Sequence, residues 1–431
     1  MAAVEIGTNW SGNYAYGASA LHHPRMLGEL QGLVADARAL RALGSRHSFT
    51  SIADATELVA LDGLPGAIEV DRAAQTVTAP GSTTYAALAE ALNREGLALH
   101  NMASLPHISV AGAIATGTHG SGDRKGNLAT AVRAVEMVDA EGELRTVAAG
   151  DPDFEAVVVG LGALGIVTRV TLSAQPFYEM RQRVFQGVSW DTLFARFDEI
   201  YGAGESVSVF HLCGEQTEQV WVKRLGAGSG GGDDGGDDGG DDGDLEDLLG
   251  VRAATVELHP VLGGDPVNCT EQQGVPGPWS ERLPHFRSGF LPSSGEELQS
   301  EFFVERADAA AAVEAVRGLA QEIVPLLLIS ELRTIARDSL WLSPHEGRDS
   351  FALHFTWRRQ PAEVEAVVAK IETALAPLGA RAHWGKVFTA RADAIAPLYP
   401  RMAEFLALRE RLDPEGTFVN DWLRTKVLDA A

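Results

Sequence analysis

A run of small residues at positions 104–122 constrains this chain more than any other segment. It reads SLPHISVAGAIATGTHGSG, and glycine, alanine, serine and threonine fill most of its positions. Small side chains let main-chain N–H groups approach a bound anion closely and form a concave surface around it. Two shorter runs precede it, LGSRHSF at 43–49 and GSTT at 81–84. Each run alone fits an ordinary tight turn equally well, so an anion-binding interpretation requires the three together.

The segments around these runs predict a mixture of strands and helices. Up to about residue 180 the elements are short, and the spacing of apolar residues predicts helices at 27–37 and 85–93. Short strands are expected at 58–61, 67–70, 76–78, 134–138 and 166–172. From about residue 179 the elements lengthen, with helices expected at 307–319 and 362–375. This change predicts an α+β protein of two domains.

Charge and hydropathy exclude several classes of partner. The 431 residues include 35 lysines and arginines against 59 aspartates and glutamates, a net charge of −24. So acidic a chain is a poor match for nucleic acid or for an anionic membrane surface. No apolar run approaches the roughly 20 residues that span a bilayer, and the first ten residues lack the pattern of a secretory signal. We therefore expect a cytoplasmic protein that acts on small molecules.

The segment 226–250 is rich in glycine and acidic residues. Its nine carboxylates are those of Asp233, Asp234, Asp237, Asp238, Asp241, Asp242, Asp244, Glu246 and Asp247. Because a Gly/Asp repeat has no apolar group to bury and repels itself, a disordered surface insert is expected. The spacing of the carboxylates matches neither an EF-hand nor a calcium-binding β-helix repeat. Cys213 and Cys269 are too few for a disulfide framework or a thiolate metal cage, and no metal site is expected.

Residues 160–165, GLGALG, match the glycine pattern of a dinucleotide-binding turn. In that fold a helix follows the glycines at once, because the pyrophosphate binds at the helix N-terminus. Here the β-branched run 166–172 follows, and it predicts a strand. A nicotinamide-binding Rossmann site is therefore not expected.

Two apolar strands carry polar residues at alternate positions. Residues 326–335 read LLLISELRTI, which puts Glu331 and Arg333 on one face of a strand. Residues 351–357 read FALHFTW, which puts His354 and Thr356 together, opposite four large apolar side chains. An exposed ion pair or a hydrogen-bonded core histidine would explain either pattern singly. Because unpaired charge is costly among apolar neighbours, a polar pocket at these strands is favoured.

In their order along the chain, these segments resemble FAD-linked oxidoreductases of the vanillyl-alcohol-oxidase (PCMH) type, and within that type the alditol oxidases. The resemblance extends from NWSGN at 9–13 to FVN at 418–420 and omits the Gly/Asp insert. Its strongest blocks lie at 44–49, 101–122, 268–271, 274–279 and 383–388. It implies an FAD-binding domain at 1–178, a mixed α/β substrate (cap) domain at 179–383, and a C-terminal segment at 384–431 that returns to the FAD domain.

The resemblance also implies FAD attached covalently through its 8α-methyl group to His47. A neutral imidazole is a competent nucleophile toward that methyl group. At Arg46, where relatives often have glycine, we expect pyrophosphate packing or the efficiency of attachment to differ. The implied cofactor contacts are Leu43, Gly44, Ser45, Arg46, His47, Ser48, Phe49, Ser104, Ser109, Gly112, Ala113, Ile114, Ala115, Thr116, His119, Ile166, Val167, His383 and Asn420.

For the substrate, the resemblance implies a polyol such as xylitol or sorbitol. Its hydroxyls would be bound by Ser104, Glu331, Arg333, His354 and Thr356. Lys386, Arg333 and His354 are expected to be catalytic: the proton of the terminal hydroxyl leaves toward Arg333 and Lys386 while hydride moves to flavin N5. Reoxidation by O2 would yield an aldose and hydrogen peroxide. No metal is required, and a monomer is compatible with the sequence.

Two alternatives stay open. A sugar-1,4-lactone oxidase or dehydrogenase of the same fold would carry a similar Glu331/Arg333 pair, although the blocks at 268–272 and 274–279 favour the alditol branch. A flavoprotein without turnover, serving as a sensor or scaffold, is opposed by the match at every pocket position. Anaerobic bleaching of the flavin by a panel of polyols and lactones separates these three possibilities.

Overall fold

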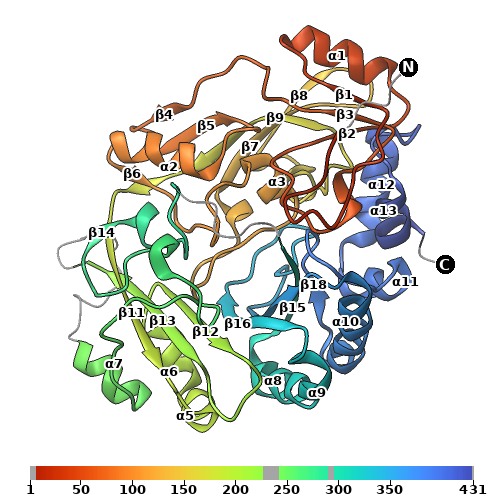
Figure 1. Ribbon diagram of the computed structural model, residues 1–431. Coiled ribbons are helices and arrows are strands. Elements are labelled where there is room, and N and C mark those ends of the chain that lie inside the picture. Colours follow the sequence, from red (N-terminus) through yellow and green to blue (C-terminus); the bar gives the residue numbers. More distant parts are fainter. Residues whose placement is uncertain (1–5, 227–241, 290–295, 430–431) are drawn as a thin grey trace.

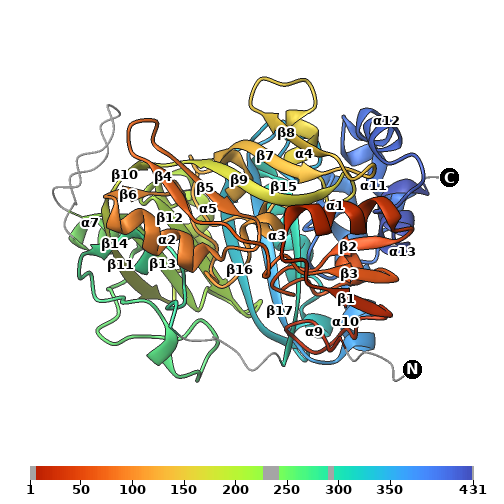
Figure 2. The same ribbon diagram turned by 90° about the horizontal axis from the view of Figure 1, so that it is seen from above.

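The chain is organised in two halves that face each other. The computed structural model describes residues 6–226, 242–289 and 296–429. In Figure 1 the segments before about residue 178 form the upper half, and most of those that follow form the lower half. The two halves overlap when the molecule is seen from above (Figure 2). Functional residues can therefore come from both sides of one broad contact.

Two sheets shape the upper half. In a parallel sheet, β3 (Glu57–Val59) lies between β1 (Ala20–His22) and β2 (Leu40–Ala42). An antiparallel sheet consists, in spatial order, of β4 (Glu69–Asp71), β5 (Thr76–Pro80), β9 (Ile166–Ser173), β7 (Val132–Val138) and β8 (Leu144–Ala148). Buried and half-buried residues alternate along all of β9, as expected for a strand with one face in the core. β6 (Leu97–Ala98) and β10 (Gln175–Pro176) form a separate pair.

Short helices connect these strands. They are α1 (Leu27–Asp36), α2 (Tyr85–Arg94), α3 (Val110–Ala115) and α4 (Phe154–Val158), with 3-10 turns η1 (Ser51–Ala53) and η2 (Leu128–Ala131). α2 begins where the hydroxyl of Thr84 accepts from Ala87 N at 3.3 Å, and it buries Tyr85, Leu88 and Leu92 at helical spacing. α3 is formed by the longest small-residue run and is only six residues long.

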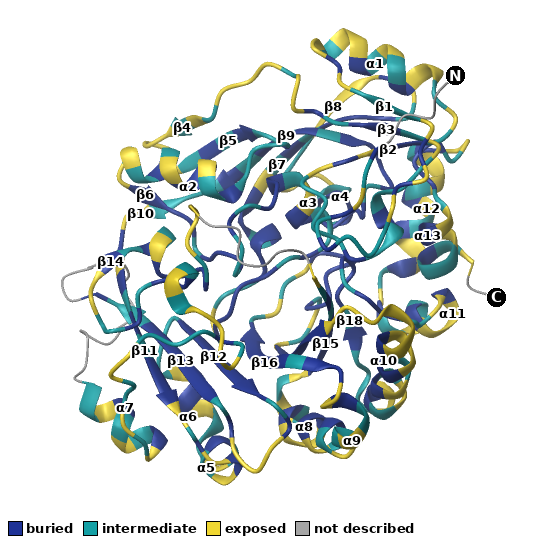
Figure 3. Cartoon of the chain, in the orientation of Figure 1, coloured by how far each residue is buried: buried dark blue, intermediate teal, exposed yellow. Residues whose placement is uncertain are grey.

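One large antiparallel sheet forms the lower half. In spatial order its strands are β14 (Gly277–Pro278), β11 (Glu179–Gln186), β13 (Gln219–Leu225), β12 (Ser206–His211), β16 (Leu327–Ile335), β17 (Ser350–Arg358), β15 (Glu297–Glu305) and β18 (Arg381–Ala382). The central pair sets Glu331 on β16 opposite His354 on β17. Along β16 and β17 nearly every residue is buried, so both faces of the sheet are covered (Figure 3).

Helices cover the lower face of this sheet (Figure 1). The helices of this half are α5 (Trp190–Ala195), α6 (Phe197–Gly202), α7 (Asp242–Leu249), α8 (Ala309–Arg317), α9 (Ala320–Ile323) and α10 (Pro361–Leu375). Its 3-10 turns are η3 (Pro266–Asn268), η4 (Trp279–Glu281), η5 (Arg306–Asp308) and η6 (Ala376–Leu378). The ring of Phe351 on β17 packs on Phe197 and Tyr201 of α6. The upper face is thereby left for the contact with the other half.

The C-terminal segment returns to the upper half. It contains α11 (Ala392–Ile395), η7 (Ala396–Leu398), α12 (Met402–Leu412), α13 (Asp421–Leu423) and the last turn η8 (Arg424–Leu428). Leu40 N donates to Thr417 O at 2.8 Å, and the Asn420 amide donates to Asp54 O at 2.7 Å. Both ends of the chain therefore meet beside the parallel sheet.

Most predicted elements lie within a few residues of the observed ones, and the predicted α+β class is confirmed. The strand predicted after the GLGALG turn is confirmed as β9, so a strand and not a helix follows these glycines. The disorder predicted for 226–250 is wrong at its C-terminal end, where α7 forms. Leu245 and Leu249 of α7 are buried, and Arg196 donates to the carbonyls of Asp247 and Leu248. The rest of that prediction, 227–241, lies outside the described residues. In the described segments, no helix has the length and apolar character needed to cross a bilayer.

Candidate active site

A cavity of about 490 Å³ lies between the two halves of the molecule. Segments 41–49, 81–82, 103–119 and 161–167 of the upper half form one side of it, the small-residue wall. Side chains of β15, β16 and β17, with residues 383–386, form the other side, the strand wall. All three small-residue runs therefore contribute to the same cavity.

Glycine is required in the small-residue wall because its segments pack closely. A Cβ on Gly81 would lie 2.8 Å from Val167 O and 3.0 Å from Ala111 Cβ. A Cβ on Gly44 would lie 2.7 Å from the hydroxyl of Ser109, whose N–H donates to Ser45 Oγ at 3.0 Å. The runs at 43–49 and 104–122 are thus joined directly, and their main chains border the cavity.

Arg41 adds a buried positive charge to the small-residue wall. It is 4% exposed, and its guanidinium donates to the carbonyls of Leu161, Gly162 and Phe418 at 2.6, 3.2 and 2.7 Å. Burial lowers the pKa of Arg41 to about 10, so the group remains charged at neutral pH. No carboxylate of the described segments forms an ion pair with it. An anion in the cavity would offset this charge, which is otherwise costly to bury.

His47 also lies on this wall. Its ring stacks on Trp10, with centroids 5.6 Å apart and planes 21° from parallel. Burial lowers the pKa of His47 to about 4, so the imidazole is neutral and nucleophilic at ordinary pH. Its Nδ1 is buried without a hydrogen-bond partner in the described part of the chain. A ring in this state can form a bond to a group in the cavity.

Arg46 adopts a backbone conformation that favours glycine. Its φ is 61°, in the left-handed region, where a side chain adds strain. Its guanidinium donates to Ile6 O at 2.6 Å and lies over the ring of Tyr16. An arginine in place of glycine at position 46 therefore adds backbone strain. Its guanidinium is held by Ile6 and Tyr16, which lie outside the three runs.

Sixteen of the nineteen predicted cofactor residues line the cavity. Ile114, Ile166 and Asn420 do not line it. Ile114 and Ile166 are each 1% exposed and pack in hydrophobic clusters. The amide of Asn420 instead donates to the carbonyls of Ser51, Ile52 and Asp54 and accepts from Leu423 N. These bonds attach the C-terminal segment to residues 51–54.

The strand wall follows the predicted alternation and extends it. Glu331 and Arg333 share a face of β16, with Arg333 Nε 3.4 Å from Glu331 Oε1. On β17, His354 Nε2 lies 3.1 Å from the hydroxyl of Thr356. All four side chains line the cavity, as do Ser104 and Lys386. The sequence reasoning did not find β15, whose Glu297, Gln299 and Glu301 also line it. These three residues show the same alternation in ELQSEFFVE and could have been found by it.

Glu301 is the centre of the charges on this wall. It is 1% exposed, and its two oxygens accept from Arg333 Nη2 at 3.0 Å and Lys386 Nζ at 2.7 Å. Burial raises the pKa of Glu301, but Lys386, His119 and Arg333 lower it further, so it lies well below its ordinary value. Burial lowers the pKa of Lys386, and Glu301 partly offsets this. The carboxylate therefore fixes both cations in the cavity.

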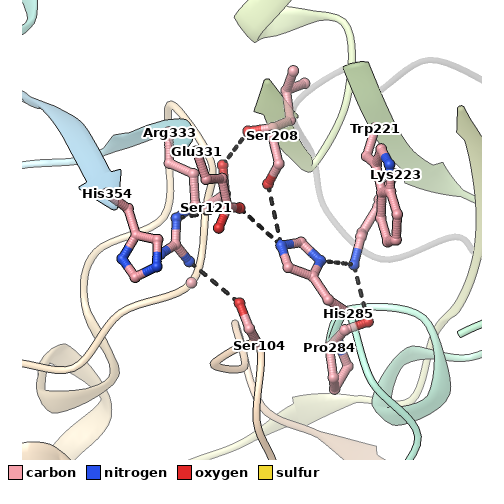
Figure 4. Close-up of polar contacts among 12 residues, drawn as sticks. Ser104, Ser121, Ser208, Trp221, Lys223, Pro284, His285, Glu331, Arg333 and His354 are labelled. Atoms are coloured by element: carbon pink, nitrogen blue, oxygen red, sulfur yellow. Dashed lines mark hydrogen bonds and ion pairs between the residues drawn. The ribbon is translucent and has the colours of Figure 1, made fainter. Parts of the chain in front are cut away.

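Glu331 is held from the opposite side (Figure 4). Its Oε1 lies 2.8 Å from Nε2 of His285, a cavity residue that the sequence reasoning missed and that no local pattern indicates. Burial raises the pKa of Glu331, yet Arg333 and His285 lower it further, so the carboxyl is ionised. Oε2 has no hydrogen-bond partner among the described residues. This oxygen can accept from a ligand.

His354 is neutral and has a defined tautomer. Burial, followed by the charge of Lys386, lowers the pKa of His354 to about 4. Lys386 Nζ lies 2.8 Å from its Nδ1, and an ammonium can only donate. The ring proton is therefore on Nε2 and points to the hydroxyl of Thr356.

Atoms of His119, Glu301 and His383 lie within 4.8 Å of one another, as metal ligands would. Arg333 and Lys386 already contact both oxygens of this carboxylate and would repel a cation. Nδ1 of His119 donates to Gly120 O at 2.8 Å, and Nδ1 of His383 accepts from Gly385 N at 3.0 Å. The chemistry of the group favours an ion-pair network over a metal centre.

The comparisons with known proteins agree with this geometry. Residues 18–148 match the family described as "FAD binding domain", and 297–426 match "D-arabinono-1,4-lactone oxidase". An alditol oxidase of a Streptomyces species is 46% identical over 97% of this chain and 98% of its own length. An L-gulono-1,4-lactone dehydrogenase of Mycobacterium tuberculosis is 28% identical over 97% and 98%. The crystal structure of cholesterol oxidase from B. sterolicum has a TM-score of 0.77 at 15% identity, covering 98% of this chain and 96% of that one.

The fold and cavity define an FAD-linked oxidoreductase of the vanillyl-alcohol-oxidase type. Within that class, the chain belongs to the alditol oxidase family. The small-residue wall fits FAD, because it combines closely packed glycines, an uncompensated buried Arg41 for the pyrophosphate and an unpartnered imidazole nitrogen on His47.

Proposed function

We propose that the protein oxidises the terminal primary hydroxyl of an alditol, such as xylitol or sorbitol, to the aldose, with O2 reduced to hydrogen peroxide. The balance of charge on the strand wall carries this proposal. Two buried carboxylates, Glu301 and Glu331, are matched there by two cations, Arg333 and Lys386, while burial raises the pKa of the third carboxyl, that of Glu297. An uncharged substrate with many hydroxyls suits such a wall, since hydroxyls donate and accept hydrogen bonds without adding charge. The similarity to Streptomyces alditol oxidase supports the same substrate class.

FAD, when bound, supplies the hydride acceptor and the site of reaction with O2. Lys386 and Arg333 hold the reacting hydroxyl oxygen. Because Glu301 fixes both cations beforehand, they need not reorganise as negative charge develops on that oxygen. Lys386 Nζ gives a proton to Nδ1 of the neutral His354 imidazole, 2.8 Å away, as it takes up the proton of the hydroxyl. Ser104, Thr356 and Oε2 of Glu331 hold further hydroxyls.

Peroxide release tests this function directly. The purified yellow protein should release hydrogen peroxide when given xylitol or sorbitol in air-saturated buffer. Anaerobically, the same polyols should bleach the flavin. A flavin that no polyol bleaches would contradict the proposal.

Sugar-1,4-lactone oxidation is a second candidate. The match of residues 297–426 to the D-arabinono-1,4-lactone oxidase family favours it, because that segment contributes β15, β16 and β17 to the cavity. Gulonolactone and galactonolactone belong in the same anaerobic panel. Bleaching by the lactones at lower concentration than by the polyols would favour this candidate.

We also propose that FAD is bound covalently at His47, a neutral nucleophile on the small-residue wall. Wild-type protein should keep yellow, fluorescent flavin after denaturation, whereas His47→Ala should release it. His23→Ala, at an exposed histidine paired with Asp62, serves as the control and should retain the flavin. Flavin released from denatured wild-type protein would exclude the covalent bond.

A further inference from the structure

A buried lysine behind the strand wall has no part in the mechanism above. Lys223, on β13, is 0% exposed, and none of the described carboxylates forms an ion pair with it. Its Nζ donates to Leu283 O at 2.6 Å and Pro284 O at 3.0 Å, and it lies 3.2 Å from Nδ1 of His285 (Figure 4). Three N–H groups thus meet three acceptors. Methionine would fill the same space without the cost of desolvating a charge, so packing alone does not explain a lysine here.

The imidazole of His285 connects this lysine to Glu331. Burial, with a further contribution from the charge of Lys223, lowers the pKa of His285 to about 4, so the ring is neutral and carries one proton. An ammonium has no lone pair, so Nδ1 must accept from it. The ring proton is then on Nε2, which donates to Glu331 Oε1 at 2.8 Å. The other tautomer would set two acceptors against each other at this distance.

We infer that Lys223 and His285 are positioning residues that hold Glu331 as an ionised acceptor for a substrate hydroxyl. Lys223 selects the tautomer of His285, and that tautomer occupies Oε1 of Glu331 and leaves Oε2 free toward the cavity. The identity of the hydroxyl rests on the proposed polyol function, whereas the Lys223–His285–Glu331 relay is a property of the folded chain. Because Lys223 lies outside the cavity, it would change the affinity for substrate hydroxyls without contacting them.

A double-mutant cycle on the flavin-loaded enzyme tests the relay. Lys223→Met removes the donor to Nδ1, and kcat/KM for xylitol should fall at least about tenfold, the effect of a lost hydrogen bond to a charged group. His285→Gln places an amide donor near the position of Nε2 without needing a tautomer, so its kcat/KM should fall less than that of Lys223→Met. In the double variant, kcat/KM should be little lower than in His285→Gln alone.

Lys426→Met is the matched control. Lys426 is half-buried and, like Lys223, donates to main-chain carbonyls, those of Phe388, Thr389 and Ala390, but it has no contact with His285. It should lower stability without changing kcat/KM. An equal loss from Lys223→Met in the wild-type and His285→Gln backgrounds, or no loss in either, would overturn the inference.

NMR spectroscopy can detect the tautomer of His285 without substrate turnover. In the 15N NMR spectrum of the loaded wild-type protein, the His285 ring should show a protonated Nε2 and a bare Nδ1, with its signals assigned by their absence in His285→Gln. A protonated Nδ1 would contradict the relay, even if Lys223→Met does not fold. If wild-type enzyme oxidises no polyol while this tautomer is observed, the proposed function fails and the relay stands.

Discussion

The two walls of the cavity are built in different ways. The small-residue wall presents main chain from runs of consecutive residues, with the buried cation of Arg41 held by three carbonyls. The strand wall presents side chains from alternate positions of three strands, and its charges are paired with one another through Glu301. The first wall therefore requires small residues, and the second requires that its charged side chains balance one another. Substitutions should affect stability and cofactor retention at the first wall and turnover at the second.

The largest effect is expected at Glu301. Glu301→Gln removes the charge that fixes Arg333 and Lys386, which leaves Lys386 without an ion pair and Arg333 with Glu331 alone in a buried site. Breaking a buried pair in this way costs several kcal/mol, so kcat/KM for xylitol should fall at least about 100-fold. Steady-state peroxide assays on the loaded protein provide the measurement. Glu297→Gln, on the same face of β15 and without an ion pair in the described segments, is the control; a similar loss there would erase the distinction between the two positions.

The next effect is expected on the other wall, at Gly81. Gly81→Ala would force Cβ against Val167 O, which is main chain and cannot rotate away. We expect the free energy of unfolding to fall by about 1–3 kcal/mol, with less FAD retained on purification. Gly28→Ala in α1, where nothing lies within 4 Å of the added Cβ, should instead raise stability by up to about 1 kcal/mol. Chemical denaturation and flavin absorbance measure both, and unchanged values for Gly81→Ala would contradict the packing argument.

A pH effect should follow from Lys223. Burial lowers the pKa of Lys223 to about 7, while the charge of Glu331 opposes that shift. The charged or titratable groups that face Lys223 are Glu331, Arg333, Cys269, Arg282 and His285. As the pH rises above this pKa, the ammonium loses a proton. The neutral amine can itself accept a hydrogen bond, so it no longer requires Nδ1 of His285 to be the acceptor. In pH profiles, kcat/KM should therefore fall above about pH 7 in wild type, and less so in His285→Gln.

The smallest effect is expected at Arg46. Arg46→Gly relieves the strain of a φ of 61° but loses the bond to Ile6 O, whereas Arg46→Ala loses the bond and keeps the strain. The glycine variant should therefore be more stable than the alanine variant by about 1 kcal/mol. Thermal unfolding of the two proteins provides the comparison. Equal stability would show that the left-handed conformation is not costly here.

The same difference between the walls explains how far the sequence could predict them. The runs around Gly44 and Ser109 are contiguous, so composition and resemblance located them. On the strand wall, alternation predicted the pairing of Glu331 with Arg333 and of His354 with Thr356, and the same rule would have found Glu301. It could not find His285, which lies in a loop and contacts Glu331 only because β16 and the 283–286 segment meet in the folded protein. Nor could it show that the amide of Asn420 donates to main-chain carbonyls of residues 51–54 and so attaches the chain end.

The hydrogen bond from Arg41 to Phe418 O joins residues 377 positions apart and contributes to the cofactor side of the cavity. During synthesis, the segment that carries Arg41 leaves the ribosome long before its partner has been translated. At about 5–20 residues per second, that interval is roughly 20–75 s. The nascent chain must therefore hold an incomplete flavin site throughout this time, and capture of the cofactor in its final geometry follows synthesis of the segment that carries Phe418.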